Sequence, residues 1–374
     1  MQLGDLATPA VLVDRTRLLN NITTMQAAAS AGGLRLRPHA KTHKSPRIAE
    51  WQLDAGAIGI TVAKVGEAEM FVDAGVNDIR LAYPLPASTA PRIVALMDRA
   101  RLSICVDHLE VATRWSDAMT AAGRRLDVLV KVDVGFHRCG IDPASARAAE
   151  FITRVAQLPG FRFRGLLGHA GQSYHAPTTA EIARIAHSEA EILRNLATTV
   201  KGVGIGIAEL SVGATPTARY SFDEPELTEA RPGNYVFLDL TQVALGVADI
   251  SSCALSVLAT VVSKPTDDRL ILDAGSKTLS SDRARGGESL DGFGAICPTF
   301  TTQAPDDRLL IERLSEEHAV VRISDGGSRL EPGDRVRIIP NHACVVANLT
   351  DVLQLTEGDT VIEEIAVAAK GTNR

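Results

Sequence analysis

The sequence lacks a close pair of cysteines, a long apolar run and a cluster of basic residues. Its five cysteines are odd in number and far apart, which argues against a disulfide framework and favours a reducing cytoplasm. No apolar segment is long enough to cross a membrane, and the N-terminus does not read as a signal peptide. No run of Lys or Arg could follow a phosphate backbone. We therefore expect neither a membrane nor a nucleic acid as partner.

What the sequence does contain is the apolar and charged composition of a soluble globular protein. Apolar residues make up 45% of the 374 residues, charged residues make up 22%, and the net charge is −6. Such a composition can bury a large core. The length suits an α/β barrel with a modest second domain.

Short apolar runs alternate with amphipathic segments along the first two thirds of the chain. The segments at 15–29, 145–156 and 179–196 have apolar residues at helical spacing. Alternation of this kind is typical of repeated βα units, and eight runs predict a (β/α)8 TIM-like barrel. The runs lie at 34–38, 57–62, 79–82, 102–106, 128–132, 163–168, 208–212 and 235–238.

The pattern changes near residue 247 to alternating β-like stretches, at 255–262, 269–272, 318–323 and 335–339. We therefore predict a barrel domain over 9–246 and a β-rich domain that comprises 247–374 together with residues 1–8. The stretch 282–294, rich in glycine and charge, is expected to be a surface loop, and such loops often line sites.

Active sites of such barrels lie at the C-terminal ends of the strands. The first run leads into Pro38-His39-Ala40-Lys41-Thr42-His43-Lys44. A lysine in a barrel mouth is costly unless it is paired or working, and desolvation makes its amine a better nucleophile. Lys41 is in phase with the strand, so we interpret it as a Schiff-base lysine. Lys44 is interpreted as a surface residue.

Two loops of small residues follow later runs. Gly213-Ala214-Thr215-Pro216-Thr217 can surround an anion with backbone N–H groups and a hydroxyl, and Gly233-Asn234 can add more donors. Each loop alone could be an ordinary βα turn. Together they favour a phosphate site.

His342 and Cys344 stand two positions apart on a segment expected to be extended, so both would point to one face. An imidazole and a thiolate can hold a divalent ion, with zinc favoured. Two ligands alone are weak evidence, and a structural role for the pair stays open.

In combination these motifs resemble the fold-type III pyridoxal phosphate (PLP) enzymes, in the branch of D-threonine aldolase, D-serine dehydratase and D-threo-3-hydroxyaspartate dehydratase. The resemblance covers essentially the whole chain. The order and spacing of the matching motifs along the chain are highly specific. The matching segments are 5–9, 37–41, 132–140, 169–174, 211–217, 231–235, 273–275, 317–318 and 340–344.

The resemblance implies an alanine-racemase-like barrel, a β domain, PLP, a divalent ion (zinc or manganese) and a homodimer whose partner closes each active site. Lys41 would carry the cofactor, Arg138 would contact its phenolic oxygen, and His342 and Cys344 would bind the ion. His169 and His39 are candidate bases, although His39 could instead be structural. The other implied cofactor-binding residues are Tyr174, Gly213, Thr215, Arg231, Gly233, Asn234 and Tyr235.

The substrate implied is a β-hydroxy-D-amino acid, and two outcomes share the same residues. Removal of the hydroxyl proton gives retro-aldol cleavage to glycine and an aldehyde. Removal of the α-proton gives loss of the β-oxygen, and then a keto acid and ammonia. We favour the aldolase, with the dehydratase as the alternative. A racemase would need no metal pair, and a non-catalytic PLP carrier would lack the β domain.

Overall fold

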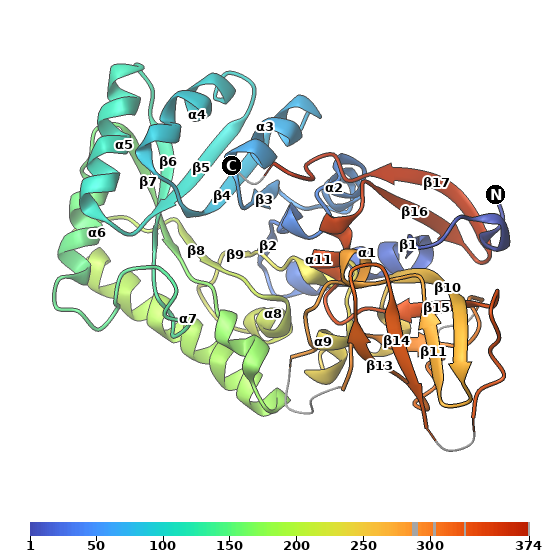
Figure 1. The fold of residues 1–374 in the computed structure, drawn as a ribbon. Helices are drawn as coiled ribbons and strands as arrows, with labels where there is room; N and C mark the ends of the chain where they lie inside the picture. Colours follow the sequence, from blue (N-terminus) through green and yellow to red (C-terminus); the bar gives the residue numbers. More distant parts are fainter. Residues whose placement is uncertain (286–290, 302–303, 325–326, 373–374) are drawn as a thin grey trace.

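The chain folds around two β-sheets, seen on the left and right of Figure 1. The structure is a computed structural model that describes residues 1–285, 291–301, 304–324 and 327–372. Residues 286–290 of the expected surface loop lie outside this described part. No helix in the described ranges is both long and apolar enough to span a membrane.

Before residue 286, eight parallel strands form a barrel in the order β2-β9-β8-β7-β6-β5-β4-β3. The two edge strands meet through a parallel bridge between His39 and Thr61, and the N–H of Ile58 donates to the carbonyl of Leu36 at 2.9 Å. The sheet therefore closes as a TIM-like barrel, as predicted. The strands are β2 (Arg35–Leu36), β3 (Ile60–Val62), β4 (Asp78–Pro84), β5 (Arg101–Val106), β6 (Leu126–Lys131), β7 (Phe161–Leu167), β8 (Glu209–Val212) and β9 (Glu229–Ala230).

Helices follow the strands around the outside of the barrel (Figure 1). They are α1 (Arg15–Ala31), α2 (Pro46–Asp54), α3 (Val65–Asp73), α4 (Ala90–Leu96), α5 (Leu109–Ala121), α6 (Ala148–Ala156), α7 (Thr179–Gly202) and α8 (Thr215–Ser221). Side chains cap the two longest at their N-termini. Asp14 accepts from the N–H of Arg17 at 3.0 Å, and Thr178 accepts from the N–H of Glu181 at 3.2 Å.

The second sheet has nine strands within the described residues, in the order β11-β14-β13-β12-β15-β10-β1-β16-β17. It confirms the expected β-rich C-terminal part, and it also contains β1 (Ala10–Asp14), which pairs with β10 and β16. The division at residues 9 and 246 stays a prediction. The other strands are β10 (Leu255–Thr266), β11 (Arg269–Leu272), β12 (Ala295–Cys297), β13 (Leu309–Leu314), β14 (Ala319–Ile323), β15 (Arg335–Ile339), β16 (Val352–Glu357) and β17 (Thr360–Ala366).

Shorter helices and 3-10 turns lie between these elements, and several of them hold site residues. They are the α-helices α9 (Leu240–Ala244), α10 (Ser276–Leu279) and α11 (Ala343–Leu349), and the 3-10 turns η1 (Leu3–Asp5), η2 (Ala40–Thr42), η3 (Ala87–Thr89), η4 (Gly171–His175), η5 (Asn234–Val236) and η6 (Ile250–Ser252).

The prediction for the eighth barrel strand was wrong. The apolar run at 235–238 begins as the buried turn η5, and the strand is the preceding pair Glu229–Ala230. The error has a physical cause, because Glu229 points into the barrel, where its charge is matched by arginines. An apolar pattern cannot reveal a strand whose buried residue is a carboxylate.

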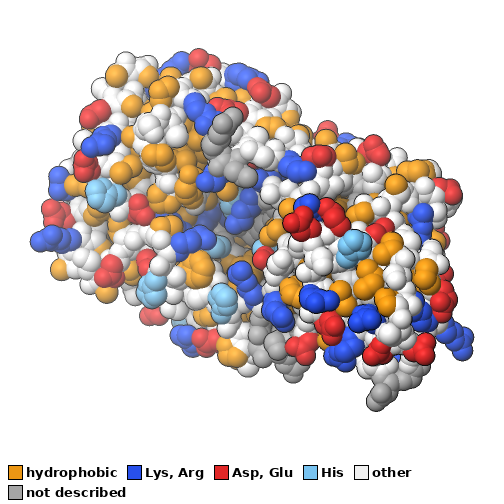
Figure 2. Space-filling view, viewed as in Figure 1, with side chains coloured by type: hydrophobic (Ala, Val, Ile, Leu, Met, Phe, Trp, Pro, Cys, Tyr) orange, Lys and Arg blue, Asp and Glu red, His pale blue; other side chains and the backbone are white. Residues whose placement is uncertain are grey.

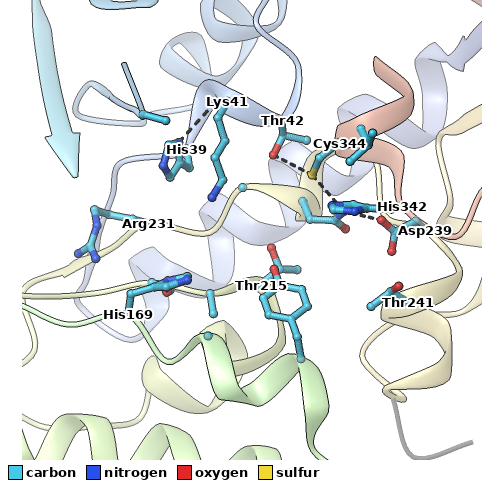
Figure 3. A pocket seen from close by; sticks show the side chains of 18 of the residues that line it. His39, Lys41, Thr42, His169, Thr215, Arg231, Asp239, Thr241, His342 and Cys344 are labelled. Carbon is cyan, nitrogen blue, oxygen red and sulfur yellow. Dashed lines mark hydrogen bonds between the residues drawn. The ribbon is translucent and has the colours of Figure 1, made fainter. Parts of the chain in front are cut away.

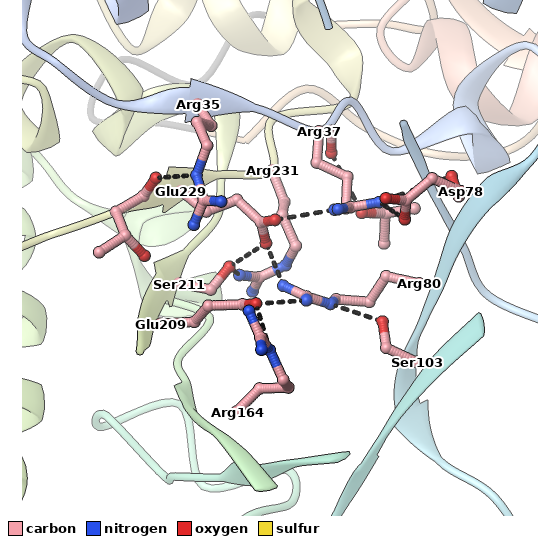
Figure 4. A network of polar contacts seen from close by, with 12 residues as sticks. Arg35, Arg37, Asp78, Arg80, Ser103, Arg164, Glu209, Ser211, Glu229 and Arg231 are labelled. Carbon is pink, nitrogen blue, oxygen red and sulfur yellow. Dashed lines mark hydrogen bonds and ion pairs between the residues drawn. The ribbon is translucent and has the colours of Figure 1, made fainter. Parts of the chain in front are cut away.

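A network of buried charges occupies the barrel interior (Figure 4). Arg37 Nε donates to Glu229 Oε2 at 2.7 Å, and Arg80 bridges Glu229 and Glu209. Burial alone would raise the pKa of Glu229, but the charges of Arg80 and Arg37 outweigh it and lower the pKa to about 2. The network reaches the cavity above it through Arg231, which donates to Ser211 Oγ and to the carbonyl of Gly168.

Glu229→Gln should lower the thermal unfolding midpoint at pH 7, because Arg37 and Arg80 each lose one of their two counter-charges and keep only Asp78 and Glu209. Breaking a buried pair in this way should cost about 3 kcal/mol of unfolding free energy. The folded-state pKa of about 2 lies below the ordinary 4.5, so the carboxylate's contribution is present above pH 4.5 and lost as the pH falls towards 2. The difference between wild type and variant should shrink over that window. The exposed Glu110→Gln is the control, since its pair with Arg114 contributes little. Equal midpoints at pH 7 would refute this role.

Candidate active site

A cavity of about 510 Å³ opens at the C-terminal ends of the barrel strands, against the second sheet. The space-filling view shows this hollow near the centre of the molecule, with Lys and Arg side chains around it (Figure 2). Twelve of the thirteen predicted site residues line it, and Tyr235 does not. The twelve are His39, Lys41, Arg138, His169, Tyr174, Gly213, Thr215, Arg231, Gly233, Asn234, His342 and Cys344.

Lys41 extends into the cavity from the 3-10 turn η2, and not from a strand (Figure 3). The expectation that it is in phase with the first strand was therefore wrong. The turn forms because the His39 side chain caps it, accepting from the N–H of Lys41 at 3.4 Å. The pKa of Lys41 is lowered, mainly because its amine is buried. The nearby Cys344 raises this pKa, and the positive charge of Arg138 lowers it further. A lysine of this kind is a suitable nucleophile for an aldehyde.

Lys44, expected on the surface, is 5% exposed and also lines the cavity. Its Nζ lies 3.4 Å from Glu67 Oε1, so the charge is paired. The sequence could not reveal this because Glu67 comes from α3, after the next strand. The structure thus places two lysines in one cavity, and Lys44 differs from Lys41 in having its own carboxylate.

The two glycine loops lie close to the η2 turn, in a space too narrow for side chains. A Cβ on Gly233 would be 2.9 Å from Thr42 Oγ1, and one on Gly213 would be 3.0 Å from Arg231 Cβ. Asn234 Oδ1 is buried without a hydrogen-bond partner in the described chain. Thr215 Oγ1 accepts from the N–H of Tyr235 at 3.2 Å. A group with anionic oxygens fits this cradle.

Two histidines in the cavity have lowered pKa values, which favours their neutral form. Burial lowers the pKa of His39 and of His169 well below 6.5, and neighbouring cations lower it further. His169 Nδ1 bonds the carbonyl oxygen of Gly213. A carbonyl only accepts, so Nδ1 carries the proton and Nε2 has a free lone pair. His169 can therefore act as a base near neutral pH.

His342 and Cys344 lie beside each other at the start of α11 (Figure 3). The expected extended segment was wrong, because the helix begins at Ala343 with His342 as its N-cap. His342 also bonds Asp282 through Nδ1 at 2.6 Å, and Cys344 Sγ lies 3.4 Å from Thr42 Oγ1.

The donor atoms of this pair suit a metal ion. Burial would raise the pKa of Cys344, but the hydrogen bond from His342 outweighs it and lowers that pKa. A thiolate, an imidazole and a carboxylate that orients the imidazole form a donor set suited to zinc or a similar ion. Among the described residues no group of three or more His, Cys, Asp or Glu side chains is gathered as for a complete site.

Asp239 is a site residue that the sequence analysis missed. It is fully buried, and burial raises its pKa. Its Oδ2 accepts from Asn234 Nδ2 at 2.6 Å and from the N–H of Ala343 at 2.9 Å. Asp239 thus joins the glycine cradle to the helix of the His–Cys pair. Its position before α9, as an N-cap after an apolar run, was the available signal.

Tyr235 packs beneath the cavity. Its hydroxyl accepts from Gln52 Nε2 at 2.9 Å, and Gln52 Oε1 accepts from His43 Nε2 at 3.2 Å. Burial lowers the pKa of His43 to about 4, so this histidine is neutral. The chain Tyr235, Gln52 and His43 supports the η2 turn from below, and only the backbone N–H of Tyr235 meets the cradle.

Comparisons with known proteins match both parts of the chain. Residues 13–241 match the family described as alanine racemase, N-terminal domain, and residues 254–356 match a putative serine dehydratase domain. D-threo-3-hydroxyaspartate dehydratase of Delftia sp. (strain HT23) is 34% identical, covering 96% of both chains. D-threonine aldolase of Arthrobacter sp. is 34% identical, covering 98% of this chain and 93% of that one. A solved cysteine-to-alanine mutant of D-threo-3-hydroxyaspartate dehydratase, in the metal-free form, has a TM-score of 0.91 at 31% identity, with 98% of each chain covered.

Proposed function

The chain belongs to the alanine-racemase-like PLP enzymes that include D-threonine aldolase and D-serine dehydratase, and on that premise we propose that it is a metal-dependent lyase of the D-threonine aldolase type. Its substrates are β-hydroxy-D-amino acids. The Cα–Cβ bond breaks, the hydroxyl oxygen becomes the carbonyl of an aldehyde, and a proton added at Cα gives glycine.

The cofactor assigned to the cavity is PLP, with Lys41 as its covalent anchor. The cradle of Gly213, Thr215, Gly233 and Asn234 would hold the phosphate. PLP supplies an electron sink for the bonds at Cα of the amino acid. Arg138 would bind its phenolic oxygen, and Tyr174 and His169 would lie beside the ring. Arg231, held by Ser211 and Gly168, would face the pyridine nitrogen.

The metal assigned to the cavity is a zinc or manganese ion on His342 and Cys344. A bound ion acts as a Lewis acid, lowering the pKa of the substrate's hydroxyl. Asp282 would hold the His342 ring in position through Nδ1. The metal-free form of a cysteine mutant in the similar dehydratase is consistent with a cysteine ligand.

The observation that carries the aldolase assignment is the bond from His169 Nδ1 to the carbonyl oxygen of Gly213, which leaves Nε2 as the basic atom of the ring. Retro-aldol cleavage needs a base for the hydroxyl proton, and a neutral imidazole in the cavity meets that need. Its Nδ1 bond to Gly213 fixes the tautomer. His39, similarly neutral, is the second candidate base, although its bond to the N–H of Lys41 also gives it a structural role.

Dehydration is the second candidate function, favoured by the lowered pKa of Lys41. The amine of Lys41 could remove the α-proton, and the β-hydroxyl of the substrate would then leave as water. An ion held by His342 and Cys344 would supply Lewis-acid assistance to that departure. The similarity to D-threo-3-hydroxyaspartate dehydratase supports this alternative as strongly as the similarity to D-threonine aldolase supports cleavage.

The purified enzyme with PLP and added Zn²⁺ or Mn²⁺ should convert D-threonine to glycine and acetaldehyde in equal amounts. L-threonine is the stereochemical control, D-serine the second substrate, and EDTA the metal control. Keto acid and ammonia in place of glycine would establish the dehydratase. Metal-independent racemisation with neither set of products would overturn both functions.

We also propose a homodimer in which the partner closes each cavity, as is usual in this family. Light scattering of the cofactor-loaded protein tests it, with twice the 39.7 kDa of one chain as the expected mass. A monomer with full activity would contradict it.

A further inference from the structure

The cavity contains more positive charge than the cofactor assignment uses. Lys44 is paired with Glu67, Arg231 is held in the barrel, and Lys41 and Arg138 are assigned to PLP. The lining also includes Lys64, Arg283 and Arg285. Among the described residues, none of these three has a carboxylate within ion-pair distance. Instead, Lys64 Nζ lies 4.9 Å from the centre of the Tyr83 ring, and the guanidinium group of Arg283 lies 5.0 Å from the centre of the Phe293 ring.

The two arginines are exposed and lie on the metal side of the cavity. They follow Asp282, whose carboxylate bonds His342 at 2.6 Å and whose carbonyl accepts from Asn341 Nδ2 at 3.1 Å. The N–H of Arg285 donates to Thr241 Oγ1 at 3.3 Å. Contacts on both sides therefore hold residues 282–285 beside the His342 and Cys344 pair.

This placement sets what the arginines can reach in a bound substrate. In the proposed function the β-hydroxyl lies at the His342 and Cys344 pair. The remaining substituent of the β-carbon is one bond from the carbon that carries this hydroxyl, so it lies on the same side of the cavity. A methyl group there offers the two guanidinium groups nothing to bind, whereas a carboxylate can accept paired N–H donors from arginine.

We propose that Arg283 and Arg285 form a subsite for a carboxylate on the β-carbon, so that the preferred substrates are β-hydroxy-D-amino dicarboxylic acids. The inference rests on the proposed function and names its substrate class. D-threonine is then a poorer substrate than 3-hydroxy-D-aspartate, whose cleavage gives glycine and glyoxylate. Dehydration of the same substrate would use the same subsite.

The test compares kcat/KM of the metal-loaded holoenzyme for 3-hydroxy-D-aspartate and D-threonine, in wild type and in the double variant Arg283→Gln with Arg285→Gln. Hydrogen bonds between charged partners justify an expected loss of about 10- to 100-fold per arginine on the dicarboxylic substrate. Activity on D-threonine should change by less than about threefold. Arg114→Gln, which changes an exposed arginine of α5, is the matched control and should change neither value.

The outcomes separate this inference from the function on which it rests. An equal loss on both substrates would mean that the arginines bind the α-carboxylate, which both share, and would overturn the subsite. Unchanged kcat/KM on both substrates would overturn it as well. Should the wild type convert neither substrate by cleavage or by dehydration, the proposed function itself fails.

Discussion

Replacing Lys41 by alanine should reduce lyase activity by about 10⁴-fold or more, because the variant loses the covalent anchor of the cofactor. It should also lose the visible absorbance of lysine-bound PLP. Lys41 reaches into the cavity from η2, and its lowered pKa suits attack on an aldehyde. Activity and visible absorption spectra of the purified variant measure both effects.

Lys201→Ala is the matched control, since this lysine lies at the exposed end of α7 beside Glu226. It should keep full activity and the wild-type spectrum. A Lys41→Ala protein that folds, retains the lysine-bound spectrum and cleaves substrate would contradict the assignment. In that event Lys44, the other lysine near Glu67, becomes the candidate anchor.

His342→Ala and Cys344→Ala should each lower both metal content and activity, with a loss of about 10²- to 10³-fold in kcat. Lewis-acid stabilisation of the developing alkoxide is worth several kcal/mol, and neither remaining residue of the pair can hold the ion alone. Metal content by mass spectrometry and activity with added Zn²⁺ or Mn²⁺ check the two effects together.

EDTA treatment of the wild type should reproduce the loss, and added ion should restore activity to the wild type alone. The control is His187→Ala, an exposed histidine that bonds Glu224 on the outside of the barrel. Full activity of either metal-pair variant after exhaustive chelation would contradict the metal assignment. A variant that loses activity while keeping its metal would also contradict it.

Most of the barrel could be predicted from the sequence because its strands are apolar and its helices amphipathic. The exception, β9, shows the limit, since the buried charge of Glu229 is paired with Arg37 and Arg80, which other parts of the barrel contribute. No local pattern contains those partners. The buried Lys44 was missed for the same reason, because Glu67 neutralises it from another element.

The candidate site could be predicted only as a set of motifs. Lys41, His169 and the glycine loops were found because each follows a barrel strand, where sites of this fold lie. Asp239 was missed, since its role depends on the later approach of α11 to the cradle. Similarly, the arginines at 283 and 285 stand in a stretch that reads as surface loop, and only the folded chain brings them to the cavity.

The most direct test of the central claim is to map the lysine that carries PLP. Borohydride reduction of the holoenzyme makes the bond between lysine and cofactor permanent, and peptide mass spectrometry then locates the added pyridoxyl phosphate. We predict that it lies on Lys41, in a peptide separable from Lys44 by fragmentation. The account would be contradicted if the pyridoxyl phosphate were found on Lys44 or on any other lysine, or if no lysine carried it.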